Sequence, residues 1–259
     1  MKILVTGAAG TIGSAVRRHL GDDYDIVSLT HRPADFPSHV ADIGDLDAIQ
    51  PAFEGVDAVV HLAASISVET PWPEIHRDNI VGVYNIFEAA HRAGVETVVF
   101  ASSNHAVGMY EYDNKPEIYA LDHPLVVDDQ VEVRPDSYYG VSKVFGEAMG
   151  RYYSDMHGLR VFCLRIGSVR ADDDPTSDDA GASSGWLNLT PEQTYERLRA
   201  TWLSQRDCAH LIERCLANTD IRFGIYYGIS NNPRQFWDIS KARRELGYEP
   251  QDSAPERPA

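Results

Sequence analysis

The chain has 259 residues, 43% of them hydrophobic, so it is long and apolar enough for one α/β domain with a small appendage. Its formal net charge is −16, which disfavours nucleic acid and membrane surfaces as partners, because both are negatively charged. The three cysteines are odd in number and lack CxxC spacing, which argues against a disulfide framework and a zinc site. We therefore expect no metal and a reducing, cytoplasmic location.

Strands and helices are predicted to alternate along most of the chain. Short runs rich in β-branched residues predict strands at 3–6, 26–29, 40–41, 58–62, 97–101 and 160–166. Helical patterns lie between them at 12–20, 49–53, 75–93 and 138–157. This alternation predicts an α/β fold with a doubly wound parallel sheet of Rossmann type, covered by helices on both faces.

Beyond residue 168 the alternation breaks, and we divide the chain there. Residues 1–168 are predicted to form a dinucleotide-binding domain with the catalytic residues, and 169–250 a small substrate-binding or lid region packed on it. This region should contain an acidic mobile loop at 172–185, helices at 191–202 and 207–217, a strand at 224–227 and a last helix ending at Gly247. Residues 251–259 are predicted to be a flexible tail.

Composition and the start of the chain add two expectations. Only four of the 23 basic residues are lysine, against 39 acidic residues, which fits either adaptation to high salt or a GC-rich genome that encodes arginine for lysine. The chain enters a strand at once, which leaves no room for a signal peptide, and no apolar run approaches the ~20 residues of a membrane span.

Three glycines between the first strand and the first helix predict a nucleotide site. Gly7 permits a tight turn, Gly10 lets the backbone approach a pyrophosphate, and Gly13 allows close helix packing. The helix that begins at Thr11 and Ile12 then offers unpaired N–H groups and a partial positive charge to the phosphates. An acidic protein can hold an anionic cofactor in this way.

The strongest chemical signal is Tyr139-Gly-Val-Ser-Lys143. On a helix, residues four apart share a face, so the ammonium of Lys143 should lie one turn from the phenol of Tyr139. A nearby positive charge favours the phenolate, which a phenol with a pKa near ~10 needs in order to act as a base near neutral pH. Tyr138 has no lysine four residues on, and we do not expect it to be catalytic.

The GxxGxxG turn followed by YxxxK resembles the extended branch of the short-chain dehydrogenase/reductase superfamily. The resemblance implies that Ser103 orients the reacting alcohol, that Lys143 also binds the cofactor ribose, and that Asn79 matches the family's helix asparagine. It further implies that the cofactor is contacted by Asp42 and Ile43 near the adenine, by Leu62, Ala63 and Ala64 below the ribose, and by Ile166.

The end of the second strand bears on the choice between NAD and NADP. An NAD site usually has an acidic residue there to bind the adenosine 2′-hydroxyl, but this chain has His31 and Arg32. A cation would favour a 2′-phosphate, so we lean slightly to NADP. Alternatively, Arg32 points into solvent and the site accepts both cofactors.

Several segments, among them Ala101-Ser-Ser-Asn-His105 and Arg165-Ile-Gly-Ser168, resemble uronate dehydrogenases and related glucose 6-phosphate and aldose 1-dehydrogenases. The resemblance implies oxidation of the anomeric carbon of a cyclic sugar, with a hexuronate as our first choice and a neutral aldose such as arabinose, or glucose 6-phosphate, as alternatives. It assigns substrate binding to Ser67, Ser103, Asn104, His105, Tyr139, Ser168 and Arg197.

In this assignment Arg197 would pair with the sugar carboxylate. A nucleotide-sugar epimerase or dehydratase shares the same motifs and is a second possibility. Family members usually pair through the helices that contain Asn79 and Tyr139, so we expect a homodimer or a larger homo-oligomer.

Overall fold

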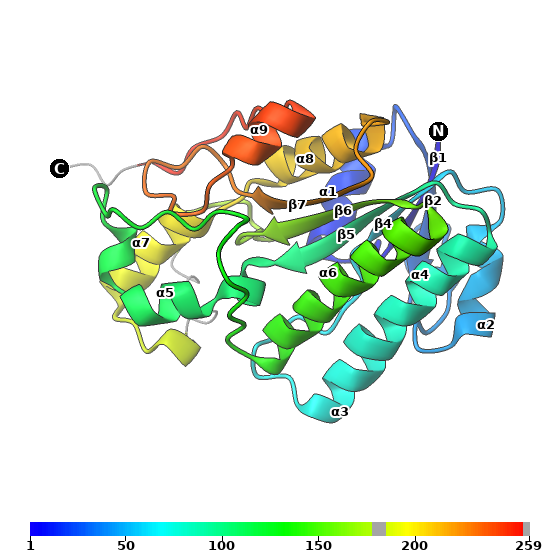
Figure 1. Ribbon diagram of the computed structural model, residues 1–259, viewed down its shortest axis with the longest axis horizontal. Coiled ribbons are helices and arrows are strands. Elements are labelled where there is room, and N and C mark those ends of the chain that lie inside the picture. The colour runs from blue at the N-terminus through cyan, green and yellow to red at the C-terminus, as the bar shows by residue number, and fades with distance from the viewer. Residues whose placement is uncertain (178–184, 256–259) are drawn as a thin grey trace.

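The computed structural model describes residues 1–177 and 185–255, and its centre is one parallel sheet with strand order β3-β2-β1-β4-β5-β6-β7 (Figure 1). All pairings within this sheet are parallel, which confirms the predicted doubly wound α/β fold. The strands are β1 (Lys2–Thr6), β2 (Asp25–Thr30), β3 (His39–Val40), β4 (Ala58–His61), β5 (Thr97–Ser103), β6 (Arg160–Ile166) and β7 (Phe223–Gly228).

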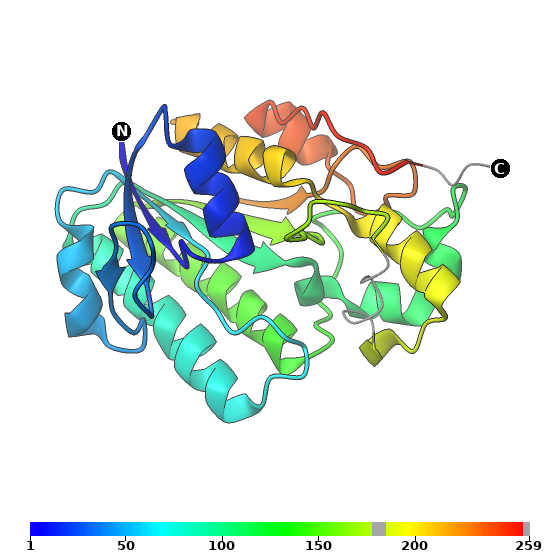
Figure 2. The same ribbon diagram turned by 180° about the vertical axis from the view of Figure 1, so that it is seen from behind.

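Helices cover both faces of the sheet and enclose two apolar cores. On one face lie α1 (Thr11–Leu20) and α8 (Gln205–Ala217), which pack side by side (Figure 2). On the other face lie α4 (Gly82–Arg92) and α6 (Tyr138–His157). The remaining helical segments are α2 (Leu46–Ile49), η1 (Gln50–Phe53), α3 (Trp72–Glu74), η2 (Ile75–Val81), η3 (Asn104–Val107), α5 (Met109–Asn114), η4 (Glu117–Tyr119), η6 (Gly185–Leu187), α7 (Pro191–Thr201) and α9 (Ser240–Leu246).

The predicted helix at 75–93 is interrupted in a way that its sequence pattern does not reveal. Its first part, η2, is a π-helix, and α4 continues directly from it. The wider turn carries Asn79, whose amide nitrogen donates to the backbone oxygen of Ser65 (2.9 Å) and to the hydroxyl of Ser142 on α6 (3.0 Å). Single π-helical turns often occur at functional sites, and this one ties η2 to α6.

Helix α6 occupies the predicted residues and lies close against the sheet. Its N-terminus is capped by the side chain of Ser137, which accepts a hydrogen bond from the backbone N–H of Gly140 (3.0 Å). At Gly146 an added Cβ would lie 2.2 Å from the ring of Phe100, so a glycine is needed for this approach. Close packing of α6 on β5 fixes the depth of Tyr139 relative to the strand ends.

A buried ion pair locks α6 to β6. Arg165 meets Glu147 through two hydrogen bonds of 2.9 Å, and both side chains are almost fully buried. The hydroxyl of Ser102 donates to the same carboxylate (2.6 Å) and Tyr227 accepts a further bond from the guanidinium (3.1 Å), so the pair is well satisfied. This network therefore holds the end of β5 in place against α6 and β6.

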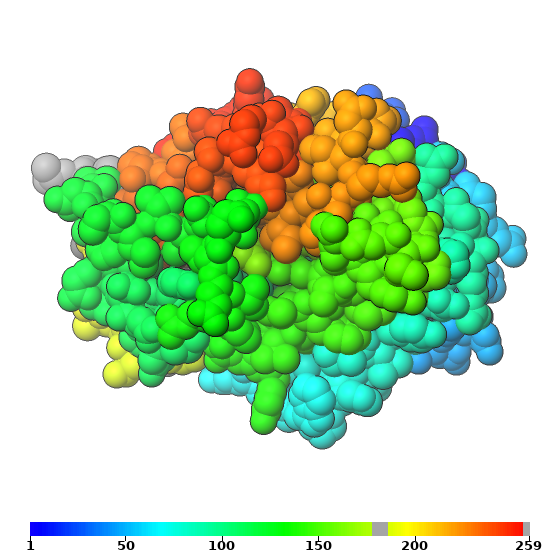
Figure 3. Space-filling model, in the orientation of Figure 1, coloured from blue at the N-terminus to red at the C-terminus, as the bar shows by residue number. Residues whose placement is uncertain are grey.

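The region after residue 168 adds to the same sheet, because β7 pairs with β6 and α8 packs on α1. The carboxyl ends of β5, β6 and β7 point toward α5 and α7 (Figures 1 and 2). In the space-filling view the segment around α5 (green) covers this end of the molecule, whereas α9 (red-orange) lies at the top of the view, over the middle of the molecule (Figure 3).

The flexible tail predicted from residue 251 is not found at residues 251–255. The carboxylate of Asp207 accepts hydrogen bonds from the backbone N–H groups of Gln251 (2.8 Å) and Asp252 (3.0 Å), and Ala254 is buried. Side-chain acceptors far away in the sequence hold this segment, which local polarity does not reveal. Residues 256–259, and residues 178–184 of the predicted mobile loop, lie outside the described residues. No helix in the described ranges combines the length and hydrophobicity that crossing a membrane requires.

Candidate active site

The turn between β1 and α1 has the shape needed to hold a pyrophosphate. Gly7 adopts φ +67°, and an added Cβ at Gly13 would lie 2.4 Å from the backbone oxygen of Gly7. Gly10, the N-cap residue of α1, has no side chain that could accept a hydrogen bond. The backbone N–H groups of Thr11, Ile12 and Gly13 therefore have no side-chain acceptor at the cap. These groups fit an anionic ligand, as predicted from the glycine spacing.

Strand β4 ends directly beside this turn and is pinned to it by Thr6. The hydroxyl of Thr6 accepts from the backbone N–H groups of Leu62 (3.1 Å) and Ala63 (3.2 Å) and lies 2.8 Å from Nδ1 of His61. Burial, together with the charge of Lys143, lowers the pKa of His61 to about 3, so its ring is neutral. The segment predicted to pass below the ribose, which continues to Ala64, is therefore held rigidly.

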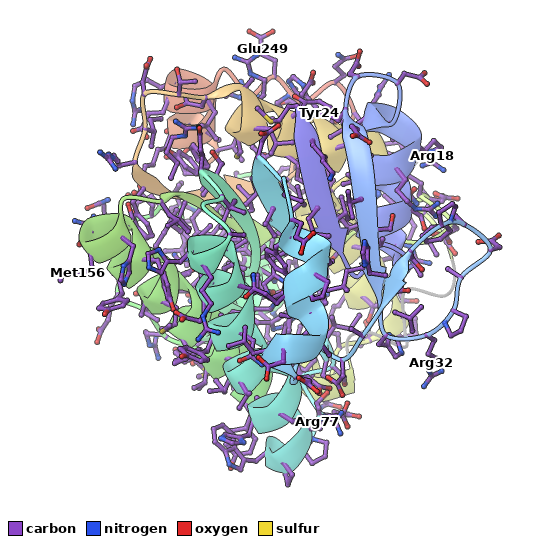
Figure 4. The ribbon with its side chains drawn as sticks, turned by 90° about the vertical axis from the view of Figure 1, so that its right-hand side faces the viewer. Arg18, Tyr24, Arg32, Arg77, Met156 and Glu249 are labelled. Carbon is purple, nitrogen blue, oxygen red and sulfur yellow. The ribbon has the colours of Figure 1, made fainter. Side chains whose placement is uncertain are left out.

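The adenine end of the site is more open. Asp42 caps its own turn by accepting from the N–H of Gly44 (2.8 Å), and the backbone oxygen of Ile43 accepts from the side chain of Asn85 (2.8 Å). His31 and Arg32 lie exposed beyond the end of β2, and Arg32 points outward from its loop (Figure 4). The side chains of His31 and Arg32 thus lie beside the expected adenosine position, and no hydrogen bond or ion pair with another described residue holds them there.

Three predicted catalytic residues meet at the carboxyl ends of β5 and β6. Ser103 and Tyr139 are both buried, and the hydroxyl of Ser103 acts on the phenol of Tyr139 to lower its pKa. The ammonium nitrogen of Lys143 donates to the backbone oxygen of Ala101 (2.8 Å) and lies 5.3 Å from the centre of the Tyr139 ring. Tyr138, by contrast, is 57% exposed and packs against Trp72.

Burial dominates the electrostatics of this group. It raises the pKa of Tyr139 to about 12, although the hydrogen bond with Ser103 favours the phenolate. Burial also lowers the pKa of Lys143 to about 7, since the described surroundings offer it a carbonyl oxygen and no carboxylate bond. The phenol is therefore protonated at neutral pH until a further positive charge enters the cleft.

His105 lies beside this group and is held by an aspartate that the sequence analysis missed. Its Nδ1 lies 2.7 Å from the carboxylate of Asp136, and its ring meets the ring of Tyr139 edge-on at 5.6 Å. The hydroxyl of Ser103 donates to the side chain of Asn104 (3.1 Å) and accepts from the N–H of His105 (3.2 Å). The position of Asp136, directly before the α6 cap Ser137, was the only available signal for its role.

The remaining predicted substrate residues have different surroundings. Ser67 is exposed and its hydroxyl accepts from the N–H of Glu69 (3.1 Å), within its own turn. Ser168 follows β6 and shares a hydrogen bond with the hydroxyl of Thr201 on α7 (2.9 Å). Ile166, at the end of β6, is buried next to Ser103 in the register of the sheet.

Arg197 was predicted to receive a sugar carboxylate, and the structure pairs it with one from the protein itself. Its Nε lies 2.6 Å and its Nη2 3.2 Å from the two carboxylate oxygens of Glu111 on α5. Burial opposes the charge of Arg197, but Glu111 and Tyr119 outweigh it and raise the pKa of the guanidinium. Glu111 was also missed, because nothing in a short helical segment indicates a partner 86 residues away.

Comparison with known proteins places this geometry in context. The model of the NAD dependent epimerase/dehydratase family matches residues 3–217. The NAD-dependent glucose-6-phosphate dehydrogenase of Haloferax volcanii is 42% identical, covering 98% of this chain and 94% of the relative. The L-arabinose 1-dehydrogenase (NAD(P)(+)) of the same organism is 39% identical, covering 98% and 97%.

A solved structure shares the fold over nearly the whole chain. It is a mutant of the uronate dehydrogenase from Agrobacterium tumefaciens complexed with NAD, with 31% identity and a TM-score of 0.79, covering 98% of this chain and 85% of that one. The relatives thus include proteins named for three different kinds of sugar, and each match covers 98% of this chain.

Proposed function

Because the chain belongs to the NAD dependent epimerase/dehydratase family, we propose that it oxidises the anomeric carbon of a cyclic sugar to the corresponding lactone, using NAD or NADP. The observation that carries this proposal is the meeting of Ser103, Tyr139 and Lys143 at the strand ends beside the glycine turn. The names of the relatives, which are sugar dehydrogenases, support the reaction class.

The chain's own residues account for the proton transfer. Ser103 hydrogen-bonds the anomeric hydroxyl, and Tyr139 removes its proton as the carbonyl forms. Lys143 binds the cofactor ribose, and its ammonium favours the phenolate form of Tyr139. When bound, the oxidised nicotinamide supplies the hydride acceptor and a positive charge. No further activation is needed, since a ring-closed sugar already carries an alcohol at this carbon.

The pKa values explain why the base acts only in the complex. With a pKa of about 12, Tyr139 is almost entirely protonated at neutral pH. A positive charge close to the phenol lowers this pKa, so the base becomes effective when the cofactor is in place. The rate of oxidation should consequently rise with pH above neutrality.

Three substrate classes are compatible with this reaction: a hexuronate, a neutral aldose such as arabinose, and glucose 6-phosphate. The hexuronate was our first expectation, on the basis of Arg197. Its pairing with Glu111 weakens that basis.

We also propose a preference for NADP, which rests on His31 and Arg32. Both are exposed where a 2′-phosphate would lie, and no acidic residue takes their place. Equal kcat/KM for the two cofactors would instead mean that Arg32 faces solvent throughout.

We further propose that the protein forms a homodimer through α4 and α6. This face exposes large apolar side chains in the monomer, namely Tyr84, Tyr138, Val141, Tyr152 and Met156. Sedimentation equilibrium should report a dimer or a multiple of it. A monomer at micromolar concentration would contradict this proposal.

The decisive experiment is to incubate the protein with NAD or NADP and a panel of uronates, aldoses and aldose phosphates, and to detect both the reduced cofactor and the lactone. Tyr139→Phe should lower kcat at least ~10³-fold, whereas the matched Tyr138→Phe variant should keep it. Equal turnover in both variants would refute the assigned base. A cofactor retained through purification, with no net reduction, would instead favour an epimerase.

A further inference from the structure

A buried ion pair joins α5 to α7 and is not used in the mechanism above. The carboxylate of Glu111 receives two hydrogen bonds from Arg197, at 2.6 and 3.2 Å, and one of 2.9 Å from the hydroxyl of Tyr119. The side chains of Arg197 and Glu111 are only 5% and 1% exposed. The carboxylate is well satisfied, and two donor nitrogens of the guanidinium are already in use.

Both partners are linked through intermediate residues to the predicted substrate residues Ser168 and His105. Arg197 and Thr201 share a face of α7, and Thr201 is hydrogen-bonded to Ser168 at the end of β6. On the other side, the ring of Trp186 lies 5.5 Å from the ring of His105 and stacks on Tyr112 of α5, the residue after Glu111. The pair therefore belongs to a wall of side chains between α5 and α7 that lies one contact away from Ser168 and His105.

The net charge of this wall decides which sugars can approach it. An unpaired arginine would attract a carboxylate, but the charges of Glu111 and Arg197 cancel. A carboxylate on the sugar would have to displace Glu111, which would remain buried, unpaired and next to a second negative charge. Removing one partner from a buried ion pair carries a large penalty.

We propose that Glu111 is a specificity-determining residue that, by neutralising Arg197, selects neutral aldoses and rejects hexuronates. This inference rests on the proposed sugar 1-dehydrogenase activity and deepens it. The pair adds no net charge to this wall, which suits an uncharged sugar. Discrimination against the carboxylate should amount to at least ~100-fold in kcat/KM.

The wild-type protein provides the first test. We expect kcat/KM for the best neutral aldose among arabinose, xylose, galactose and glucose to exceed that for galacturonate, glucuronate and glucose 6-phosphate by at least ~100-fold. Lactone formation with a charged sugar as the best substrate would overturn the inference and leave the dehydrogenase proposal intact. No cofactor reduction with any sugar would overturn both.

A charge-removing variant provides the second test. Glu111→Gln keeps the shape and frees the charge of Arg197, so the ratio of galacturonate to aldose kcat/KM should rise at least ~10-fold. Asp113→Asn is the matched control, because it removes one charge from the same helix at an exposed surface pair with Arg134, and its ratio should stay within ~2-fold of wild type. An unchanged ratio in folded Glu111→Gln would overturn the inference.

Thermal unfolding gives a readout that is independent of turnover. Glu111→Gln should unfold at a lower temperature than wild type, because Arg197 is left buried without a counter-charge. Galacturonate should raise the unfolding temperature of this variant and leave that of the wild type unchanged. Stabilisation of the wild type by galacturonate would count against the inference even if Glu111→Gln failed to fold, since it needs no variant.

Discussion

Replacing Lys143 with methionine should stabilise the protein at neutral pH while abolishing its proposed activity. The ammonium is almost fully buried and bonds only the backbone oxygen of Ala101 among the described residues. Burial lowers its pKa from 10.5 to about 7, so holding the charge inside the fold opposes folding. Methionine has a similar length and carries no charge.

The magnitude follows from the difference between the two pKa values. At pH 7 the buried amine lowers the free energy of unfolding by about 4 kcal/mol relative to a group that never titrates. Leaving the oxygen of Ala101 without its donor offsets about 1 kcal/mol of the gain. Lys143→Met should therefore be more stable than wild type by about 3 kcal/mol at pH 7.

The pH dependence gives the sharper test. Between pH 7 and 10.5 the unfolded lysine binds a proton that the folded one has lost, so the stability of the wild type rises with pH in this window. The methionine variant lacks this term, and its advantage should shrink by about 2 kcal/mol from pH 7 to pH 9. Urea unfolding of both proteins at pH 7, 8 and 9 measures this difference. A difference independent of pH would refute the reasoning.

Three further changes have defined outcomes. Asp136→Asn should lower kcat/KM for the sugar about 10- to 100-fold, because His105 loses its orienting carboxylate. The Kd of the cofactor should stay unchanged, and an equal loss in cofactor affinity would contradict this prediction. Arg165→Met leaves Glu147 buried in the core without its counter-charge, so the free energy of unfolding measured in urea should fall by about 3–5 kcal/mol. A fall of less than about 1 kcal/mol would show that the pair is not buried in solution. Arg32→Glu should shift the ratio of kcat/KM for NADP to that for NAD at least ~10-fold toward NAD, and an unchanged ratio would remove Arg32 from the site.

The elements that could be predicted from the sequence are those whose cause is local. Helix α6 carries its own cap at Ser137 and its own apolar face, so its bounds could be read from the chain. Gly7 and Gly13 lie at a strand–helix junction where the lack of a side chain has structural consequences. The same locality fixed Tyr139 and Lys143 relative to each other, because a helix sets the spacing of residues four apart.

The features that escaped prediction depend on partners distant in sequence. The π-helical turn at Asn79 is stabilised by Ser65 and by Ser142 on another helix, and no residue within the turn predicts its wider geometry. Likewise, Asp252 is ordered by Asp207, although its own surroundings in the sequence are polar and rich in proline. Tertiary hydrogen bonds thus overrode a local pattern typical of a frayed end.

Charge at the site shows the same dependence on distant partners. At the predicted phosphate end, the expected attraction comes from backbone N–H groups of α1, which belong to the helix itself and could be read from the sequence. At the sugar end, the presence of an arginine in the sequence does not determine the local charge, because Arg197 is cancelled by Glu111 and Arg165 by Glu147. In this protein the 39 acidic residues outnumber the 23 basic ones, so a buried arginine has many possible carboxylate partners. An arginine at a substrate position therefore indicates an anionic ligand only once the structure has shown that no carboxylate of the protein reaches it first.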